Sequence, residues 1–551
     1  MSVSRRVGLP VLPHAVLSAP DPGSGAISLS ATDGPRIAVV TLGCDKNTVD
    51  TERILARLAG HGARLARDAN DAEVVLINTC GFIDAAREES VDTILDAVRL
   101  KGEGKLRAVV AMGCLVQRYR DELVKEIPEV DLFLGLTEIE RLVPELRARG
   151  LIDDVPANMA RPLRLLSTST RHTSYLKVSE GCDHGCAFCA IPLMRGKHRS
   201  TPIDVLIQEA RELATAGVVE LNLVSQDTTW YGRDMVRGED PFPAEYFIGR
   251  PFTAMAGAAT APSRWQPRPS VRRPHTPGTA RPSPDSAMAD AWQHGTLQAR
   301  GRSGARHGLL PDLLQTLLDE TDVPWFRLFY MYPSGIGRDL VDLMAAQPRI
   351  VPYLDMPIQH GADTVLARMR RPERQATIRE RVRWLRSSIP DVALRTTVIV
   401  GFPGETDAEF EAMLDLLEEI RFDQLGAFPY SVEENTPAAT FADHVDTSVI
   451  RERLERLVDV QRTISLERNE ARIGRVETVL IDRLEGRDMD DPDAPHDVRG
   501  AVGRTARQAL EVDGVVHIAD AHGARAGEFI AVRITGALED DLIGERVRAV
   551  R

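Results

Sequence analysis

Long hydrophobic runs and cysteines are both scarce in this sequence, and each scarcity excludes a class of protein. No apolar stretch among the 551 residues approaches the ~20 residues that a membrane-spanning helix needs. The first 34 residues carry Arg5 and Arg6 but no continuous apolar segment, which argues against a secretory signal peptide. With six cysteines and no export signal, disulfides are not the expected use of the thiols. We therefore expect a cytoplasmic protein without a membrane partner, whose cysteines bind metal.

A surplus of positive charge is also missing, because the formal net charge is −13. A protein whose main task is to hold a nucleic-acid backbone needs Lys and Arg against phosphates. Residues 471–551 contain 12 arginines, no lysine and 16 acidic residues, with acids concentrated in Asp488–Asp497 and Glu539–Asp541. This surplus of acidic residues favours a basic protein as the partner and argues against a nucleic-acid substrate, whose phosphates it would repel. A solvated acidic surface with no partner is the alternative, and a local basic groove elsewhere remains compatible with the net charge.

Strand and helix signals alternate along the first half of the chain, which predicts an α/β protein of several domains. Residues 35–150 contain three apolar runs typical of buried parallel strands, separated by amphipathic helices such as Asp84–Leu100. This pattern predicts an N-terminal doubly wound α/β domain. The three runs are Ile37–Cys44, Val74–Cys80 and Ala108–Cys114.

The strand–helix alternation then repeats about six times over residues 170–470. Six βα units predict a central partial (βα)6 barrel rather than a closed barrel of eight strands. The candidate strands are Tyr175–Gly181, Val218–Val224, Phe326–Tyr332, Tyr353–Gln359, Leu394–Val400 and Gln424–Tyr430.

Short β-like runs dominate residues 474–551 and predict a small C-terminal β-barrel. We expect two other stretches to be disordered, because one is rich in Pro, Ser, Gly and Ala and the other has almost no Ile, Leu or Val. One is the leader, residues 1–34, for which a misplaced start codon is the alternative. The other is an insertion at residues 250–308, with eight prolines, nine arginines and two acids, for which a frame-shifted or wrongly spliced segment is the alternative. The β-like runs are Val476–Ile481, Ala509–Val512, Val515–Ile518 and Phe529–Thr535.

Three cysteines stand close together directly after the first predicted barrel strand. Cys182, Cys186 and Cys189, here called the barrel triad, follow a CxxxCxxC spacing, with the aromatic residue Phe188 before the last of them. Thiolates are the usual ligands of iron–sulfur clusters, and three of them would leave one iron of a 4Fe–4S cube open to a small molecule. A zinc site is the alternative, with a histidine as fourth ligand. The histidines within reach in the sequence are His184 and His198.

The other three cysteines are dispersed but occupy equivalent places. Cys44, Cys80 and Cys114, here called the auxiliary triad, each end a predicted strand of the N-terminal domain. The carboxyl ends of parallel strands meet at one edge of a sheet, where ligands bind. The spacing therefore predicts a second three-cysteine cluster, and three separately buried structural cysteines are the alternative.

Several polar residues and glycines at strand ends are weaker candidates for contact with a cofactor. Ser225, Gln226 and Gln359 follow predicted barrel strands, where the active sites of such barrels collect. Gly401 and Glu405 belong to a turn after another strand, in which glycine lets the backbone approach a cofactor. For each of them the alternative is an ordinary turn residue or a satisfied polar group. Two tyrosines are instead expected to serve packing: Tyr332 and Tyr430.

The two triads, in this order of domains, resemble a known family. The CxxxCxxC motif after a strand is the signature of the radical S-adenosylmethionine superfamily, and the auxiliary triad and β-rich tail resemble its methylthiotransferases. The details are similar to the ribosomal, RimO-type branch, because Ser225–Thr228 reads SQDT where the transfer-RNA branch has a GQNV-like stretch, and GFID follows Cys80. The matching stretches within residues 36–545 are Thr41–Asp50, Asn78–Ser90, Gly113–Tyr119, Gly181–Arg199, Ser225–Thr228, Gln359–Gly361, Arg368–Pro372, Gly401–Thr406 and Tyr430–Thr436.

This resemblance implies a fold, cofactors and a reaction. The tail would be a TRAM domain, and the two triads would hold two 4Fe–4S clusters. The cluster on the barrel triad would bind S-adenosyl-L-methionine and, with one electron from flavodoxin or ferredoxin, cleave it to a 5′-deoxyadenosyl radical. That radical would take hydrogen from the β-carbon of an aspartate in small-subunit ribosomal protein S-twelve. The cluster on the auxiliary triad would supply sulfur, obtained from a sulfur donor and methylated by a separate S-adenosylmethionine.

Three other functions compete with this one. A transfer-RNA adenosine methylthiotransferase would have the same fold and reaction. A two-cluster electron-transfer protein is a second rival, although such ferredoxins use four-cysteine sites and have no need of open irons. A structural zinc protein that binds RNA is the third, and iron content would separate it from the cluster proteins.

Overall fold

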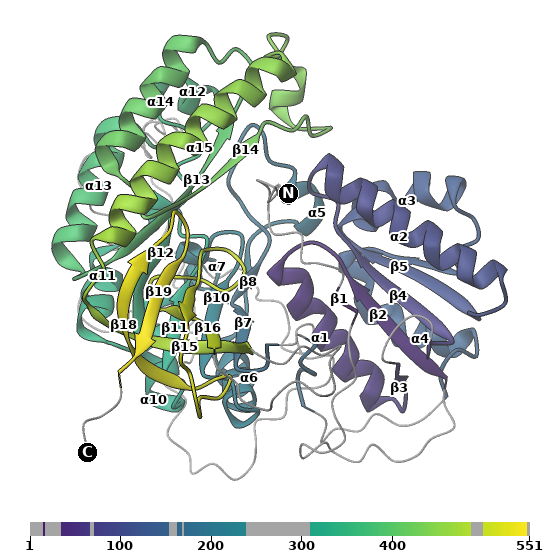
Figure 1. The fold of residues 1–551 in the computed structure, drawn as a ribbon. Coiled ribbons are helices and arrows are strands. Elements are labelled where there is room, and N and C mark those ends of the chain that lie inside the picture. The colour runs from purple at the N-terminus through teal and green to yellow at the C-terminus, as the bar shows by residue number, and fades with distance from the viewer. Residues whose placement is uncertain are drawn as a thin grey trace, which may run out of the picture.

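The computed structural model describes the chain apart from its ends and several internal stretches. The described residues are 15–16, 35–66, 71–153, 162–167, 170–237, 309–485 and 500–547. Figure 1 shows three parts: an N-terminal α/β part in purple and blue, a large sheet with teal and green helices, and a small yellow barrel packed against it. The predicted insertion 250–308 and all but two residues of the leader 1–34 lie outside the described residues. None of the helices in the described ranges has the length and apolar character of a membrane span.

The N-terminal part is a parallel sheet covered by helices on both faces, as predicted for a doubly wound domain. Strands β2, β4, β5 and β6 lie side by side in that order and run parallel. Alternate side chains of these strands join two separate cores, one with α1 and α4 and the other with α2 and α3. The strands are β1 (Ala15–Val16), β2 (Arg36–Thr41), β3 (Arg64–Leu65), β4 (Val74–Thr79), β5 (Ala108–Gly113) and β6 (Leu132–Leu134). The helices are α1 (Asp45–Gly60), α2 (Asp84–Gly102), α3 (Cys114–Glu126), η2 (Leu136–Arg141) and α4 (Leu142–Ala148).

The central part is an open sheet of six parallel strands in the order β14-β13-β12-β11-β10-β7. Its strands coincide with the six that the sequence predicts, with ends differing by a few residues. They are β7 (Thr173–Lys177), β10 (Glu220–Val224), β11 (Trp325–Leu328), β12 (Ile350–Asp355), β13 (Ala393–Val400) and β14 (Gln424–Pro429). A short hairpin, β8 (Ser179–Glu180) and β9 (Arg199–Ser200), accompanies them.

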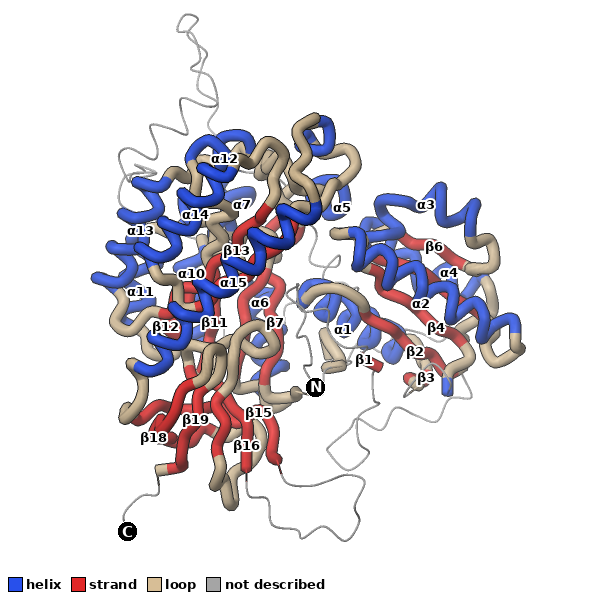
Figure 2. The backbone as a smooth tube through the Cα atoms, turned by 45° about the horizontal axis from the view of Figure 1, so that its top comes forward, coloured by secondary structure: helices blue, strands red, loops and turns tan. Residues whose placement is uncertain are grey.

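Helices pack on one face of this sheet and form the largest apolar core with it. Figure 2 shows them on one side of the strands, with the small barrel at one end of the sheet. The other face carries polar side chains such as Lys177, Glu220 and Arg327, which alternate with the core residues. The helices are α5 (Ile191–Arg195), α6 (Ile203–Thr215), η3 (Thr228–Trp230), α7 (Arg233–Arg237), α10 (Leu310–Glu320), η4 (Pro333–Gly335), α11 (Arg338–Ala346), α12 (Asp363–Arg368), α13 (Gln375–Ser388), α14 (Asp407–Ile420), η5 (Pro437–Thr440) and α15 (Thr447–Glu470).

The C-terminal part is a closed five-stranded barrel in the order β15-β16-β17-β19-β18, which confirms the predicted β-barrel. The prediction of a strand at Ala509–Val512 is wrong, because these residues form a turn. Ala509 is fully buried against Val224 and Tyr353 of the central sheet, so its apolar character serves packing between domains instead of strand pairing. The strands are β15 (Val476–Glu485), β16 (Gly500–Thr505), β17 (Val516–Ile518), β18 (Phe529–Ala537) and β19 (Leu542–Arg546).

Buried ion pairs fasten this barrel to the amino-terminal end of the central strands. Glu220, the first residue of β10, accepts from Arg327 Nε at 2.8 Å and lies 2.7 Å from Arg504 of the barrel. All three side chains are completely buried, and Arg504 is also paired with Asp482 at 2.7 Å. Burial alone would raise the pKa of Glu220, but Arg504 and Arg327 lower it to about 2. The C-terminal barrel therefore closes the amino-terminal end of the central sheet. The candidate site residues follow the carboxyl ends of the same strands.

Candidate active site

The barrel triad lies in the loop between β8 and α5, at the carboxyl end of the first central strand. The Cys182 N–H donates to the Gly196 carbonyl at 3.0 Å, and the Ala187 N–H donates to the Met369 carbonyl at 2.9 Å, which fixes the loop at both ends. The three thiols interact electrostatically with one another. Burial raises the pKa of Cys182 to about 12 and also raises that of Cys189, so these groups need a positive partner to ionise.

Two side chains from distant parts of the chain approach the middle cysteine of this triad. The Tyr332 hydroxyl and Arg371 Nη1 each lie 3.8 Å from Cys186 Sγ. The Arg371 guanidinium also lies 3.7 Å from the centroid of the Tyr332 ring. The His184 ring stacks on the Tyr332 ring, with the two centroids 3.9 Å apart and the two planes inclined by 7°. Tyr332 is therefore part of the site, in addition to serving the packing that the sequence predicts for it.

A buried carboxylate supports the Arg371 side chain. Glu373 is fully buried and lies 3.0 Å from Arg371 Nε, and neither of its oxygens has a hydrogen-bond partner within the described residues. The Arg371 guanidinium is the charge partner that offsets the cost of burying this carboxylate. The only sequence signal for this group was the stretch Arg368–Pro372, which contains Arg371.

The auxiliary triad gathers at one edge of the N-terminal sheet. Cys44 caps the start of α1, Cys80 follows β4 directly, and Cys114 begins α3 after β5. Burial, together with the nearby Cys114 and Cys44 thiols, raises the pKa of Cys80 to about 12. Burial likewise raises the pKa of Cys114 to about 11. The three thiols thus lie near enough to interact electrostatically at this edge of the sheet, and their joint binding of a cluster stays a prediction.

A glycine and an asparagine allow this close approach. Gly43 has φ +94°, and a Cβ there would lie 2.8 Å from Cys80 Cβ and 2.9 Å from Cys80 Sγ. No other residue fits at this position without moving the second cysteine. Asn47 Nδ2 donates to the carbonyls of Leu42 at 2.7 Å and Thr79 at 3.2 Å, which ties the two cysteine-bearing loops together.

A tyrosine from the central sheet reaches the auxiliary triad. The Tyr330 hydroxyl donates to Asp45 Oδ1 at 3.2 Å, and Lys46 Nζ lies 3.4 Å from the centroid of the tyrosine ring. Asp45 and Lys46 follow Cys44 in the chain, so this contact joins the carboxyl end of β11 to the auxiliary triad. The sequence contained no signal for this pairing, because its partners are 285 residues apart.

Both triads suit iron–sulfur clusters in the chemistry of their donors. Each offers three thiols, and burial disfavours the thiolate of two members of each triad. The positive charge of cluster iron would reverse that preference. The affected residues are Cys80, Cys114, Cys182 and Cys189. Within the described ranges, no three His, Cys, Asp or Glu side chains, those of the two triads included, are grouped so that they could hold a metal ion as they stand. Both histidines of the zinc alternative have other partners. His184 Nε2 lies 2.6 Å from Asp227 Oδ2, and His198 Nε2 lies 3.3 Å from Ser200 Oγ.

The weaker candidate residues divide into two groups. Ser225 and Gln226 follow β10, and Gln226 Oε1 is buried without a partner in the described chain, as a group awaiting a ligand would be. Phe188 packs beside the loop of the barrel triad, in the apolar cluster around Phe402. Gln359 has φ +71° and bridges to Val398 of β13, so its backbone extends the sheet.

The turn at Gly401 is held from within. Gly401 N–H and Phe402 N–H donate to Glu405 Oε2 at 2.8 and 3.3 Å, and Arg453 donates to Glu405 Oε1 at 2.7 Å. A Cβ on Gly401 would lie 2.3 Å from Ile450. These contacts assign Gly401 and Glu405 to closing the turn against α15, which is the alternative that the sequence left open for them.

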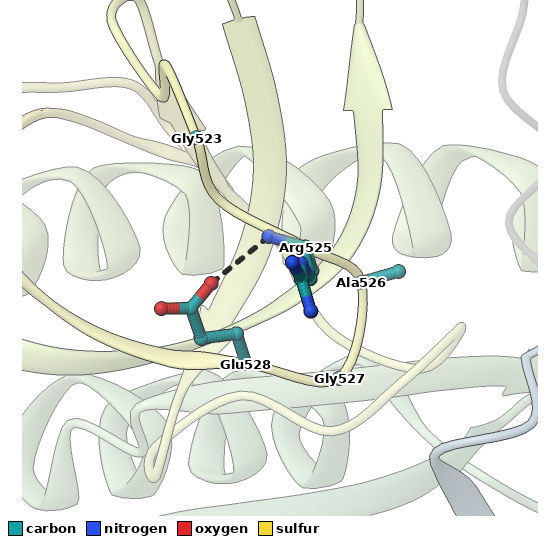
Figure 3. A pocket seen from close by; sticks show the side chains of 5 residues that line it. All are labelled: Gly523, Arg525, Ala526, Gly527 and Glu528. Carbon is teal, nitrogen blue, oxygen red and sulfur yellow. Dashed lines mark hydrogen bonds between the residues drawn. The ribbon is translucent and has the colours of Figure 1, made fainter.

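A hollow on the surface lies elsewhere, in the loop between β17 and β18. Figure 3 shows its lining side chains, with the Arg525 N–H donating to Glu528 at 3.0 Å. The hollow measures about 530 Å³ and is lined by Gly523, Arg525, Ala526, Gly527 and Glu528. It shares no residue with either triad.

Family models match three separate parts of the chain. The model of the radical SAM superfamily matches residues 303–417, that of the TRAM domain matches residues 473–547, and that of the uncharacterized protein family UPF0004 matches residues 36–135. Among solved structures, the cobalamin-dependent S-adenosylmethionine radical enzyme OxsB is 11% identical with a TM-score of 0.43, over 78% of this chain and 56% of that chain. This likeness is too remote to support a functional assignment.

Curated relatives are much closer. The ribosomal protein uS12 methylthiotransferase RimO of Anaeromyxobacter sp. (strain K) is 41% identical over 518 residues, which cover 93% of each chain. The protein of the same name from Geobacter sulfurreducens is 36% identical over 517 residues, covering 93% of this chain and 98% of that relative. The chain therefore belongs to the RimO family of radical S-adenosylmethionine methylthiotransferases.

Proposed function

We propose that this enzyme attaches a methylthio group to the β-carbon of an aspartate in ribosomal protein uS12, the small-subunit protein S-twelve, with two 4Fe–4S clusters. The observation that carries the proposal is the presence of two separate three-thiol groups, each at the carboxyl ends of parallel strands, in a chain of this family. Three thiols per group would leave one iron open in each cluster, which suits binding of S-adenosylmethionine at one and of sulfur at the other.

The barrel triad would hold the cluster that, when bound with S-adenosylmethionine and reduced by one electron, supplies a carbon radical for hydrogen abstraction. Arg371 and the Tyr332 hydroxyl lie against Cys186 and would hold this thiolate in place and balance its charge. Glu373 keeps Arg371 oriented. Gln226 provides a buried polar atom without a partner in the described chain, for the amino-acid end or the ribose of the cosubstrate.

The auxiliary triad would hold the second cluster, which supplies sulfur to the substrate carbon. Gly43 lets its cysteines approach, and Asn47 fixes the loops that carry them. Tyr330 and Lys46 close the space between this triad and the central sheet and exclude water from it. Flavodoxin or ferredoxin would provide the electron, and a separate sulfur donor would replenish the sulfur.

The acidic tail supports a basic protein as the substrate. Residues 471–551 carry a surplus of four negative charges, which attracts a Lys- and Arg-rich protein and repels phosphate. Asp488–Asp497, the most acidic stretch, lies outside the described residues, whereas Glu539–Asp541 forms the connection between β18 and β19.

Mass spectrometry of a strain that lacks this gene tests the proposal. We expect uS12 from the deletion strain to lose one methylthio modification and transfer RNA to remain unchanged. Complementation with the intact gene should restore the modification, and complementation with either triad replaced by alanine should not. Loss of a methylthio group from transfer RNA, with uS12 unchanged, would assign the enzyme to the transfer-RNA branch.

A further inference from the structure

One arginine of the barrel-triad loop turns towards the other triad. Arg195 is the last residue of α5 and follows Cys189 by six positions, yet its Nη2 donates to Asn47 Oδ1 of the N-terminal part at 2.6 Å. Its Nη1 donates to Glu180 Oε1 at 2.7 Å and lies 3.4 Å from Asp50 Oδ2. The side chain is 4% exposed. Figures 1 and 2 both show α5 at the boundary between the central part and α3.

The contacts of this helix place the guanidinium beside Cys114. Asn47 Oδ1, which accepts from Arg195, lies 3.9 Å from Cys114 Sγ. Ala190 and Met194 of the same segment pack in one apolar cluster with Cys114 and Leu136. The segment of seven residues Cys189–Arg195 thus begins with a cysteine of the barrel triad and ends with a cation that lies beside the auxiliary triad.

The charges around Arg195 keep it protonated and fixed. Lys177 of β7 pairs with Asp50 and with Glu180, so two acids and two bases form one buried network. Arg195 Nη1 and Lys177 Nζ each lie 2.7 Å from an oxygen of the Glu180 carboxylate. Replacing Arg195 by a neutral side chain would leave the network with a net negative charge at the auxiliary triad.

We propose that Arg195 is a positioning residue that sets the reduction potential of the auxiliary cluster. The inference rests on the proposed presence of that cluster. An oxidised 4Fe–4S core held by three thiolates carries one net negative charge, and one added electron makes it two. A buried cation stabilises the doubly charged form more than the singly charged form, because charges interact strongly where water is excluded. Since Arg195 ends α5, the helix that follows the barrel-triad loop, the arrangement of this segment controls the electron affinity of the other cluster.

The test uses the full chain with the barrel triad replaced by alanine, so that the auxiliary cluster is the only one after anaerobic reconstitution with iron and sulfide. Potentiometric titration with dithionite, which supplies the one electron, is followed by electron paramagnetic resonance, and iron per chain is measured in parallel. At a fixed potential we expect Arg195→Gln to lower the ratio of reduced to oxidised cluster at least tenfold, which equals 59 mV for a one-electron couple. Arg195→Lys should restore most of that ratio.

Two further variants make the result decisive. Glu180→Gln removes a negative charge from the same network and should raise the ratio. Arg53→Gln is the matched control, because Arg53 also joins the N-terminal part to the central part, at 2.7 Å from Glu209, away from the cysteines. If Arg195→Gln loses its iron, the test uses the other two variants. Glu180→Gln should then raise the reduction potential, and Arg195→Lys should keep it close to the native value. An unchanged potential in Arg195→Gln or Glu180→Gln, or equal shifts for Arg195→Gln and Arg195→Lys, would overturn the inference. A background protein without iron would overturn the auxiliary cluster itself.

Discussion

The ion pair between Glu220 and Arg504 should govern how firmly the C-terminal barrel is attached. Glu220→Gln removes a fully buried carboxylate that is shared by Arg504 and Arg327. The pKa of Glu220 falls from an ordinary 4.5 to about 2, and at 1.36 kcal/mol per pH unit this corresponds to about 3 kcal/mol. Breaking a buried pair by removing one partner costs a similar amount, about 3–5 kcal/mol.

Limited proteolysis under native conditions measures this attachment, because cleavage tracks the population of the locally opened form when opening and closing are fast. A loss of about 3 kcal/mol should speed cleavage at the junction near Ala471 about 100-fold at pH 7. Glu411→Gln is the control, since its pair with Arg456 is half exposed and surface pairs contribute at most about 1 kcal/mol.

The same measurement has a pH signature. The pKa of Glu220 is lower in the folded than in the unfolded protein, so the stabilisation is complete above the unfolded value near 4.5 and is lost as the pH falls through 4.5 towards 2. Cleavage rates of the native enzyme and Glu220→Gln should therefore converge with falling pH, read with an acid protease. Equal rates at pH 7, or a difference that stays constant down to pH 3, would refute the reasoning.

Four other predictions concern the triads, the insertion and the substrate. Alanine at all three positions of the barrel triad should leave about half of the iron and abolish cleavage of S-adenosylmethionine. Alanine at all three positions of the auxiliary triad should also halve the iron but leave that cleavage measurable. Full iron in either variant would contradict the ligand assignment. Gly43→Ala should reduce the iron of the auxiliary site alone, because its methyl group would lie 2.8 Å from Cys80 Cβ. Iron is measured in the variant that lacks the barrel triad, and unchanged iron there would contradict this prediction. Replacing residues 250–308 by a short Gly/Ser linker should preserve iron content and activity, and a soluble variant that loses both would show that the segment is structural. The full-length enzyme should bind purified uS12 more tightly than bulk transfer RNA at low salt, and the reverse order would oppose the charge argument.

Local sequence signals predicted the elements that depend on them. Apolar runs such as Val74–Cys80 and Ala108–Cys114 became strands buried on both faces. The cysteines that end them lie at one edge of the sheet, because parallel strands end there. The β-like run Ala509–Val512 misled because an apolar residue can be buried against another domain as well as in a ladder. Local pattern does not distinguish these two uses.

Side-chain partners from distant parts of the chain were beyond prediction. Arg371 lies 185 residues from Cys186, and Arg195 lies 148 residues from Asn47. Such contacts follow from the packing of distant parts of the chain on one another, and the hydrophobic periodicity of helices and strands does not predict that packing. The inward orientation of Glu405 is of the same kind, because it requires Arg453 of α15 to reach the turn.

The most direct measurement is a single-turnover reaction of the purified, anaerobically reconstituted enzyme with S-adenosylmethionine, dithionite and uS12, followed by peptide mass spectrometry. We expect one aspartate peptide of uS12 to gain the mass of a methylthio group in place of a hydrogen, with fragment ions that place it on the aspartate side chain. The variant without the auxiliary triad should cleave S-adenosylmethionine and leave that peptide unmodified. Modification of transfer RNA but not of uS12, or an intact product from the variant without the auxiliary triad, would contradict the proposed reaction.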